Sequence, residues 1–249
     1  MSVRPELSLV FPACDEEPNL GPLLDFALAV APRLAASFEV VVVDDGSRDG
    51  TAACVAARAA RDPRVRLVRH PSNRGYGAAL RSGLREARGE LVFFSDADLQ
   101  FDLRELEALL AHVPRYDVVA GWRVARRDPS LRRILAWGWN VAVRLLFDLR
   151  VRDVDCAFKL FRRHVIDAIP IASLGAFVNT EILLRARAAG FRIHQVPVSH
   201  HPRRHGRQTG ARPRVVLRAL VELALLFREL RAARPGAPTP DRVALAADR

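Results

Sequence analysis

Lysine and cysteine are scarce in this sequence. Lysine occurs once, at Lys159, so nearly all of the 39 positively charged side chains are arginines. The three cysteines, Cys14, Cys54 and Cys156, are too few for a closed disulfide framework. The chain also opens without the charged and then apolar segment of a secretory signal. We therefore expect a protein of the reducing cytoplasm.

Long apolar runs are missing too. No segment reaches the roughly 20 uninterrupted apolar residues that a membrane-spanning helix requires, and no internal repeat is visible. The 249 residues, 50% of them hydrophobic, are enough for one substantial core. We expect one domain over residues 1–211, an amphipathic helix over 212–233 and a flexible tail over 234–249.

The net charge of +11 and the pI of about 11.1 require an anionic partner or surface. Nucleic acid is one candidate, and a non-enzymatic protein that binds membranes or nucleic acid is the corresponding function class. The sequence shows no helix-turn-helix, zinc finger or aromatic RNA-binding signature, and acidic side chains follow three predicted strands. Those acids would repel a phosphate backbone, so we expect no nucleic-acid partner.

Apolar strand-like runs alternate with helical stretches along the first half of the chain. This alternation predicts an α/β fold with a mostly parallel sheet covered by helices on both faces. The expected strands cover residues 7–13, 38–44, 64–69, 90–95 and 116–121, and the expected helices cover residues 17–36, 50–61, 74–88 and 102–113.

Two aspartates separated by one residue follow the apolar strand over residues 91–94. Buried parallel strands deliver ligand-binding groups at their carboxyl ends, so Asp96 and Asp98 are expected at the mouth of a cleft. Two such close acids repel unless a cation lies between them, and a divalent ion with oxygen ligands and substrate phosphates suits the pair. Gln100 could add a neutral oxygen. The alternative is a solvated turn with two incidental acids.

Acidic residues also follow two other predicted strands. The run Val40–Val43 ends on Asp44 and Asp45, and a carboxylate at this point can accept hydrogen bonds from a ribose or a base. The first strand is followed by an acidic segment that includes Asp15. A helix that begins beside Asn73 and Gly75 has small residues in its first turn, which suits a nearby phosphate.

Four ordered motifs carry a family resemblance: Phe11–Glu17, Val43–Thr51, Asn73–Gly77 and Asp96–Gln100. Together they resemble family-2 glycosyltransferases of GT-A fold, and within that family the polyprenol-phosphate (dolichol-phosphate) mannosyl- and glucosyltransferases. The resemblance covers about residues 7–210, which would then be a GT-A catalytic domain. Departures from the family pattern stand at Cys14–Asp15, Phe101–Asp102 and Cys156–Lys159, and they bear on the donor and the acceptor pocket.

The resemblance implies a set of ligands and site residues. The donor would be a nucleotide sugar such as GDP-mannose or UDP-glucose, and the sugar would be transferred with inversion. A divalent ion, Mg²⁺ or Mn²⁺, would be held by Asp96, Asp98 and Gln100. Contacts to the base and ribose would come from Pro12, Ala13, Glu17 and Asp44.

The sequence leaves two classes of acceptor substrate open. For a polyprenyl phosphate, the resemblance places phosphate recognition on Arg123 and on an arginine of the segment over 131–147, for which we choose Arg133. A phosphate is already anionic, so no general base is needed. For a saccharide or lipid-linked saccharide hydroxyl, Glu181 or Asp155 would be the candidate base.

Two amphipathic segments, over residues 131–147 and 214–231, carry polar side chains in narrow stripes and apolar residues elsewhere. An arginine-rich loop precedes the second one, and its Arg204 and Arg207 suit a phosphate of the donor or of a lipid headgroup. We expect these segments to dock on an anionic membrane surface, which would make the protein peripheral at the inner face of the plasma membrane. Packing on the protein's own core, or a homodimer contact, is the alternative.

Overall fold

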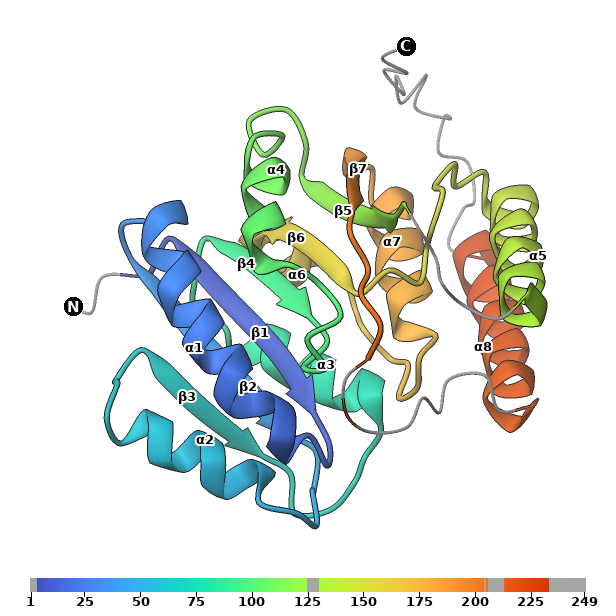
Figure 1. Cartoon of the computed structure of the whole chain (residues 1–249). Coiled ribbons are helices and arrows are strands. Elements are labelled where there is room, and N and C mark those ends of the chain that lie inside the picture. The colour runs from blue at the N-terminus through green and yellow to red at the C-terminus, as the bar shows by residue number, and fades with distance from the viewer. Residues whose placement is uncertain (1–3, 125–129, 204, 206–212, 233–249) are drawn as a thin grey trace.

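The computed structural model describes residues 4–124, 130–203, 205 and 213–232. Its centre is a seven-stranded sheet in the order β3-β2-β1-β4-β6-β5-β7, in which only β6 runs antiparallel to its neighbours (Figure 1). The mostly parallel sheet predicted from the sequence is therefore confirmed. The strands are β1 (Leu7–Ala13), β2 (Phe38–Asp44), β3 (Val65–Arg69), β4 (Leu91–Ser95), β5 (Val118–Arg123), β6 (Phe158–Arg162) and β7 (Ile193–Val198).

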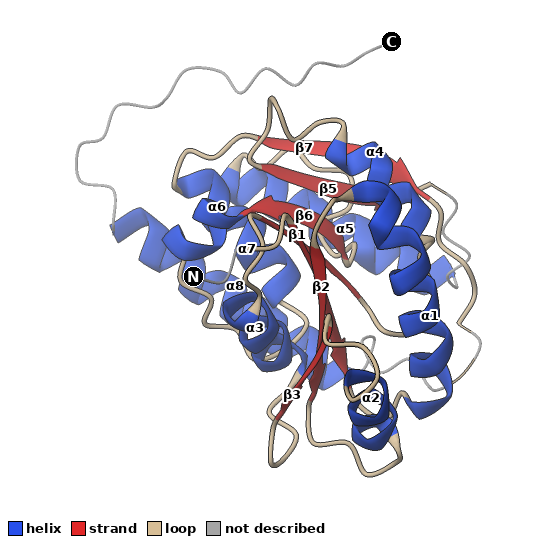
Figure 2. Ribbon diagram, turned by 90° about the vertical axis from the view of Figure 1, so that its left-hand side faces the viewer, coloured by secondary structure: helices blue, strands red, loops and turns tan. Residues whose placement is uncertain are grey.

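Helices cover both faces of this sheet. Figure 2 views the sheet nearly edge-on, with α1, α2 and α4 on one face and α3, α6 and α7 on the other. The helices are α1 (Glu17–Leu34), α2 (Thr51–Ala59), α3 (Tyr76–Glu86), α4 (Leu106–Leu110), α5 (Ser130–Phe147), α6 (Arg163–Ala168), α7 (Val178–Ala188) and α8 (Pro213–Ala232), with a 3-10 turn at Leu103–Glu105 before α4.

The core lies along the central strands. All seven residues of β1 and all seven of β2 are buried, as expected for strands covered on both faces. Across the junction of β4 and β6, the rings of Phe93 and Phe158 meet edge to face with centroids 4.7 Å apart. Burying one such side chain contributes about 1.5–3 kcal/mol, so this junction anchors the antiparallel strand firmly.

Helix α8 packs on the domain through one of its faces. Leu223 and Leu226 are buried, and the rings of Phe147 and Phe227 join α5 to α8 with centroids 5.4 Å apart. The two guanidinium nitrogens Nη1 and Nη2 of Arg185, on α7, donate to the carboxylate of Glu229 over 2.8 and 3.0 Å. Figure 1 shows α5 and α8 side by side at the end of the molecule farthest from β3.

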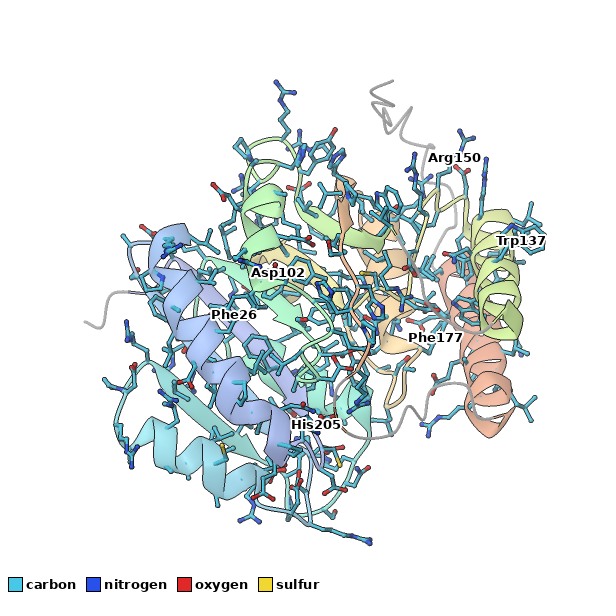
Figure 3. All side chains as sticks on the ribbon, in the orientation of Figure 1. Phe26, Asp102, Trp137, Arg150, Phe177 and His205 are labelled. Carbon is cyan, nitrogen blue, oxygen red and sulfur yellow. The ribbon has the colours of Figure 1, made fainter. Side chains whose placement is uncertain are left out.

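The outer faces of α5 and α8 remain apolar. Trp137 points away from the domain in Figure 3 and is 69% exposed, and Leu145, Leu217, Leu220, Val221 and Leu225 are also exposed. Among the residues described here, no helix combines the length and the apolar character needed to cross a bilayer.

Candidate functional site at the carboxyl ends of the strands

The acidic segments predicted from the sequence converge at one edge of the sheet. Ala13, the last residue of β1, pairs with Asp44, the last residue of β2, and the neighbouring β4 runs parallel to both. Asp96 and Asp98 follow β4 directly. Three acidic strand ends therefore open on the same side, where doubly wound sheets bind their ligands.

Asp96 and Asp98 form the most strongly perturbed part of this edge. Asp96 accepts a hydrogen bond from the hydroxyl of Tyr76 over 2.7 Å, and Asp98 accepts one from the backbone N–H of Gln100 over 3.2 Å. Burial, together with the negative charge of Asp96, raises the pKa of Asp98 to about 7. Burial also raises the pKa of Asp96, although the hydrogen bond from Tyr76 opposes it. The pair is therefore costly to ionise fully without a cation.

The side-chain oxygens around Asp96 and Asp98 fit a divalent ion that also binds a substrate. In the described part of the chain, no cluster of three or more His, Cys, Asp or Glu side chains stands ready to hold a metal alone. Mg²⁺ in particular is commonly bound by one or two carboxylates plus substrate phosphates, so two aspartates match that use. Gln100 is buried beside them, and its side-chain Nε2 donates to the carbonyl of His201 over 2.9 Å.

Asp44 is fully buried and only half satisfied. Its Oδ1 accepts a hydrogen bond from the backbone N–H of Ser47 over 3.0 Å, whereas no described residue donates a hydrogen bond to Oδ2. Nε of Arg69 lies 3.4 Å from Oδ2, an ion pair with a side chain that is 63% exposed. Leaving a buried carboxylate oxygen without a donor is costly, so Oδ2 suits a hydroxyl or N–H group of a ligand.

Asp45, in contrast, is used by the protein itself. Its carboxylate accepts hydrogen bonds from the backbone N–H groups of Arg74 and Gly75 over 2.9 and 2.8 Å, and its Oδ1 lies 2.6 Å from Nδ1 of His70. Asp45 therefore fixes the loop that leads into α3. Direct contact of Asp45 with the donor remains a prediction.

Gly75 directly precedes α3, at a point where a side chain does not fit. Its φ of +98° lies in the region that favours glycine, and an added Cβ would lie 2.4 Å from the carbonyl oxygen of Leu174. The backbone N–H of Gly77 donates to this same oxygen over 2.9 Å. The small residues of this segment therefore allow close contact with the chain over 173–175. Contact of Gly75 with a phosphate remains a prediction.

Residues after β1 are tied to the loop after β2. The backbone N–H of Arg48 donates to Asp15 over 2.8 Å, and that of Gly50 donates to Glu17 over 2.8 Å. These bonds join two of the four sequence motifs into one wall of the site.

The remaining predicted donor contacts lie along the same wall. Pro12 and Ala13 are buried at the end of β1. The side-chain amide of Asn73 donates to Sγ of Cys14 over 3.2 Å, which brings the segment before α3 to the end of β1.

Two charged residues that the sequence analysis did not single out lie at this edge. The guanidinium of Arg203 contacts the carboxylate of Glu16, and its positive charge lowers the pKa values of Asp96 and Asp98 against the stronger effect of burial. The arginine-rich loop thus reaches the site through Arg203. Arg204 and Arg207, which we predicted for this role, lie outside the described residues.

Arg123, at the end of β5, is committed to a carboxylate. Its Nε and Nη2 donate to the two oxygens of Asp153 over 2.7 and 2.9 Å, and both side chains are more than 90% buried. Burial acts to lower the pKa of Arg123, but the hydrogen bonds and charge of Asp153 outweigh it and raise the pKa. Sequence analysis missed Asp153. The side chain of Arg133, our other predicted acceptor contact, lies outside the described residues.

The single lysine lies beneath the site, on β6. Lys159 is fully buried, and its Nζ donates to the carbonyls of Val154 and Cys156 and to Oδ1 of Asn179. Burial lowers its pKa to about 8. Its charge also acts on Asp96, whose pKa it lowers. The rarity of lysine was the one signal in the sequence that could have drawn attention to it.

The two candidate bases have different surroundings. Glu181 accepts hydrogen bonds from the backbone N–H groups of Ala172 and Ser173 over 3.1 and 2.8 Å, and from Nε of Arg185 over 2.8 Å. It therefore fixes the chain before α7. Asp155 accepts a hydrogen bond from the hydroxyl of Thr180 over 3.3 Å. A catalytic role for either residue remains a prediction.

Comparison with known proteins identifies the domain. The family described as glycosyl transferase family 2 matches residues 8–169. The chain is 30% identical over 239 residues to the dodecaprenyl-phosphate galacturonate synthase of Rhizobium johnstonii, covering 93% of this chain and 69% of that protein. It is 35% identical over 205 residues to the undecaprenyl-phosphate 4-deoxy-4-formamido-L-arabinose transferase of Pseudomonas aeruginosa, covering 80% of this chain and 59% of that protein.

Solved structures agree on the fold. The glucosyl-3-phosphoglycerate synthase of Mycobacterium tuberculosis, in complex with Mn²⁺, UDP and glucosyl-3-phosphoglycerate, superposes with a TM-score of 0.68 at 21% identity. The match covers 94% of this chain and 82% of that one. The GT-A fold expected from the four motifs is therefore confirmed.

Proposed function

The chain belongs to glycosyltransferase family 2, and from this premise we propose that it transfers a sugar from a nucleotide-sugar donor to the phosphate of a polyprenyl phosphate, with inversion at the sugar carbon. The observation that carries the proposal is the buried pair Asp96 and Asp98 at the carboxyl end of β4. The relatives named for dodecaprenyl-phosphate and undecaprenyl-phosphate support this class of acceptor.

The donor half of the site is formed by carboxylates. Oδ2 of Asp44 accepts a hydrogen bond from the ribose or base, which would supply the hydrogen-bond donor that this buried oxygen lacks among the described residues. Asp96 and Asp98 would hold Mg²⁺ or Mn²⁺, which when bound offsets the charge that develops on the departing nucleoside diphosphate. Tyr76 keeps Asp96 oriented through its hydroxyl, and Arg203 adds a positive charge close to both aspartates.

The acceptor half needs no proton transfer. A phosphate monoester is already anionic at neutral pH, so its oxygen can attack the sugar carbon without a general base. This agrees with the surroundings of Glu181, whose carboxylate is engaged by two backbone N–H groups and by Arg185. Asp153 accepts hydrogen bonds from only part of the guanidinium of Arg123, and we assign the remaining N–H donors of Arg123 to the acceptor phosphate.

The outer faces of α5 and α8 dock the protein on the membrane that holds the lipid acceptor. Trp137 and Leu145 on α5 and Leu217, Leu220 and Leu225 on α8 are between 47% and 79% exposed. Apolar side chains on paired helices of a basic protein suit the interface of an anionic membrane. We place the protein at the cytoplasmic face, where a membrane-anchored polyprenyl phosphate meets a soluble nucleotide sugar.

Transfer of radiolabelled sugar into an organic extract tests the proposal. The purified protein is incubated with Mn²⁺, polyprenyl phosphate and one labelled donor at a time, including nucleotide-activated mannose, glucose, galacturonate and arabinose. We expect label in the organic phase with at least one donor, dependent on the acceptor phosphate and absent in Asp98→Asn. Equal labelling of an unphosphorylated polyprenol, or labelling of a saccharide acceptor only, would contradict the proposed acceptor.

The same assay addresses the sugar. Mannose and glucose follow from the resemblance seen in the sequence, whereas the two named relatives act on galacturonate and on a formamido-arabinose. The mannose or glucose assignment therefore stays a prediction, and the donor panel decides it.

A further inference from the structure

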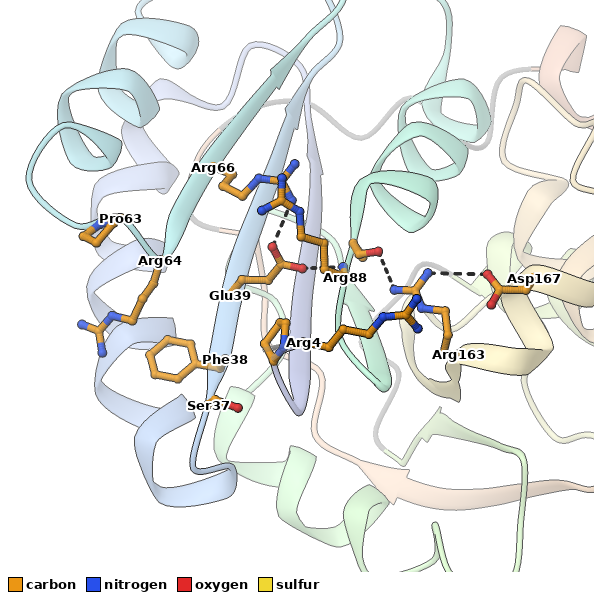
Figure 4. Close-up of a pocket in the computed structure, with 12 residues that line it drawn as sticks. Arg4, Ser37, Phe38, Glu39, Pro63, Arg64, Arg66, Arg88, Arg163 and Asp167 are labelled. Carbon is orange, nitrogen blue, oxygen red and sulfur yellow. Dashed lines mark hydrogen bonds and ion pairs between the residues drawn. The ribbon is translucent and has the colours of Figure 1, made fainter. Parts of the chain in front are cut away.

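A cavity lies at the opposite end of the strands from the candidate site, by the amino ends of β2 and β3 (Figure 4). It is a groove of about 670 Å³ between the segment before β1, the start of β3, the turn after α3 and the start of α6. A volume of this order is typical of sites for small molecules, which occupy roughly 300–1,000 Å³. Five arginines line the groove: Arg4, Arg64, Arg66, Arg88 and Arg163.

Two of these arginines are paired with carboxylates of the protein. Arg64 is paired with Asp62 through two hydrogen bonds of 2.9 and 2.7 Å. Arg66 lies 3.0 Å from a carboxylate oxygen of Glu39 and 3.0 Å from one of Glu86. These pairs neutralise part of the charge and fix the walls of the groove.

Arg163 is held mainly by backbone carbonyls and only by a long ion pair. Its guanidinium donates to the backbone carbonyls of Gly89, Leu84 and Ala87, and the nearest oxygen of Asp167 is 3.9 Å away. Burial lowers the pKa of Arg163, the charges of Asp167 and Glu39 oppose this effect, and the charge of Arg4 adds a smaller lowering. Arg4 and Arg163 therefore repel each other in the groove, and a bound anion would relieve this repulsion.

The remaining two arginines are uncommitted. Within the described part of the chain, no hydrogen bond or ion pair engages the guanidinium of Arg4 or of Arg88. Both residues are exposed, and Figure 4 shows their side chains in the groove with those of Arg66 and Arg163. Each free guanidinium offers the planar pair of donors that matches a phosphate.

We propose that this groove is a second binding site, for a small soluble anion that carries two or more phosphate groups. Several guanidinium groups arranged along one groove can contact more than one phosphate, whereas a single phosphate would leave part of the positive charge unpaired. A lipid headgroup offers the same chemistry. However, Figure 1 places α5 and α8 at the end of the sheet away from β2 and β3, so a protein docked through the exposed apolar residues of these helices would turn the groove away from the membrane.

Equilibrium dialysis with radiolabelled inorganic pyrophosphate tests the site. An excess of chelator suppresses binding that depends on a divalent ion at Asp96 and Asp98. The test variant is Arg4→Gln combined with Arg88→Gln, and the control matched in net charge is Arg115→Glu, because Arg115 is exposed and lies outside the groove. Sugar-transfer activity and the melting temperature of each variant confirm that it is folded.

We expect the double variant to lose at least tenfold in affinity for pyrophosphate while it keeps its transfer activity, and Arg115→Glu to bind like the wild type. Absence of binding to the wild type, or equal binding by the double variant, would overturn the proposal. So would equal losses in the double variant and in Arg115→Glu, since net charge alone would then explain them. If only co-sedimentation with phosphatidylglycerol vesicles depended on Arg4 and Arg88, the groove would bind headgroups and the soluble ligand would be refuted.

Discussion

Replacing Asp98 with asparagine should stabilise the metal-free protein at alkaline pH while abolishing its activity. The folded state raises the pKa of Asp98 from the ordinary 3.8 to about 7, because the carboxyl group is buried and lies beside Asp96. Between these two values the folded state binds more protons than the unfolded state. The contribution of Asp98 to stability is therefore most favourable below about pH 4 and is lost as the pH rises toward 7.

The size of the effect follows from the same values. One pKa unit corresponds to about 1.4 kcal/mol, so the rise from 3.8 to about 7 sets an upper bound of about 4 kcal/mol on the penalty at pH 8. Water and side-chain relaxation reduce such penalties, and we expect about 1–3 kcal/mol. Asparagine removes the charge and keeps the oxygen that accepts from the N–H of Gln100. For a protein of this size each kcal/mol shifts the melting temperature by about 2–4 °C.

Thermal unfolding in chelator at pH 4.5 and pH 8 measures this difference. Asp98→Asn should melt about 3–8 °C above the wild type at pH 8, with a much smaller gap at pH 4.5. Asp167→Asn, at an exposed carboxylate, is the control and should follow the wild type at both pH values. A melting temperature of Asp98→Asn at or below that of the wild type at pH 8 would refute the reasoning.

Three further changes probe the other parts of the site. Asp44→Ala should raise the KM for nucleotide sugar more than it lowers kcat, because a ribose or base contact is made alike in the ground and transition states; a fall in kcat at constant KM would argue against that contact. Arg123→Lys should raise the KM for polyprenyl phosphate by roughly tenfold, because lysine cannot keep both hydrogen bonds to Asp153 and still direct its charge at the acceptor phosphate. Unchanged steady-state kinetics would show that Arg123 is not part of the acceptor site. The double variant Leu220→Gln and Leu225→Gln should no longer co-sediment with anionic vesicles, while its melting temperature stays nearly constant because both leucines are exposed. Undiminished co-sedimentation would show that the exposed face of α8 has another use.

The first five strands were predictable because each is a compact apolar run between turn residues. The second half of the sheet was not. β6 carries Lys159 as its second residue, and this lysine can be buried because the carbonyls of Val154 and Cys156 and the side chain of Asn179 accept hydrogen bonds from its ammonium. β7 contains His194 and Pro197 and pairs with β5 alone, as suits an edge strand. Neither segment shows the periodicity of a buried strand.

The position of the site was predictable, but the separate uses of its residues were not. Asp44 and Asp45 have the same signal in the sequence, since both end one apolar strand. Only the tertiary structure distinguishes them: Asp45 is satisfied by the loop before α3, whereas Oδ2 of Asp44 receives no hydrogen bond from the described residues. Likewise, the partner of Arg123 is Asp153, 30 residues away, which no local pattern indicates.

In the mechanism that we propose, Asp96 and Asp98 receive a divalent ion together with a nucleoside diphosphate. Electron paramagnetic resonance of Mn²⁺, titrated with protein in the presence and absence of UDP or GDP, tests it most directly. The wild type should remove the signal of free Mn²⁺ much more strongly when the correct nucleotide is present, and Asp98→Asn should not. Equal binding of Mn²⁺ and nucleotide by the wild type and Asp98→Asn would contradict the claim.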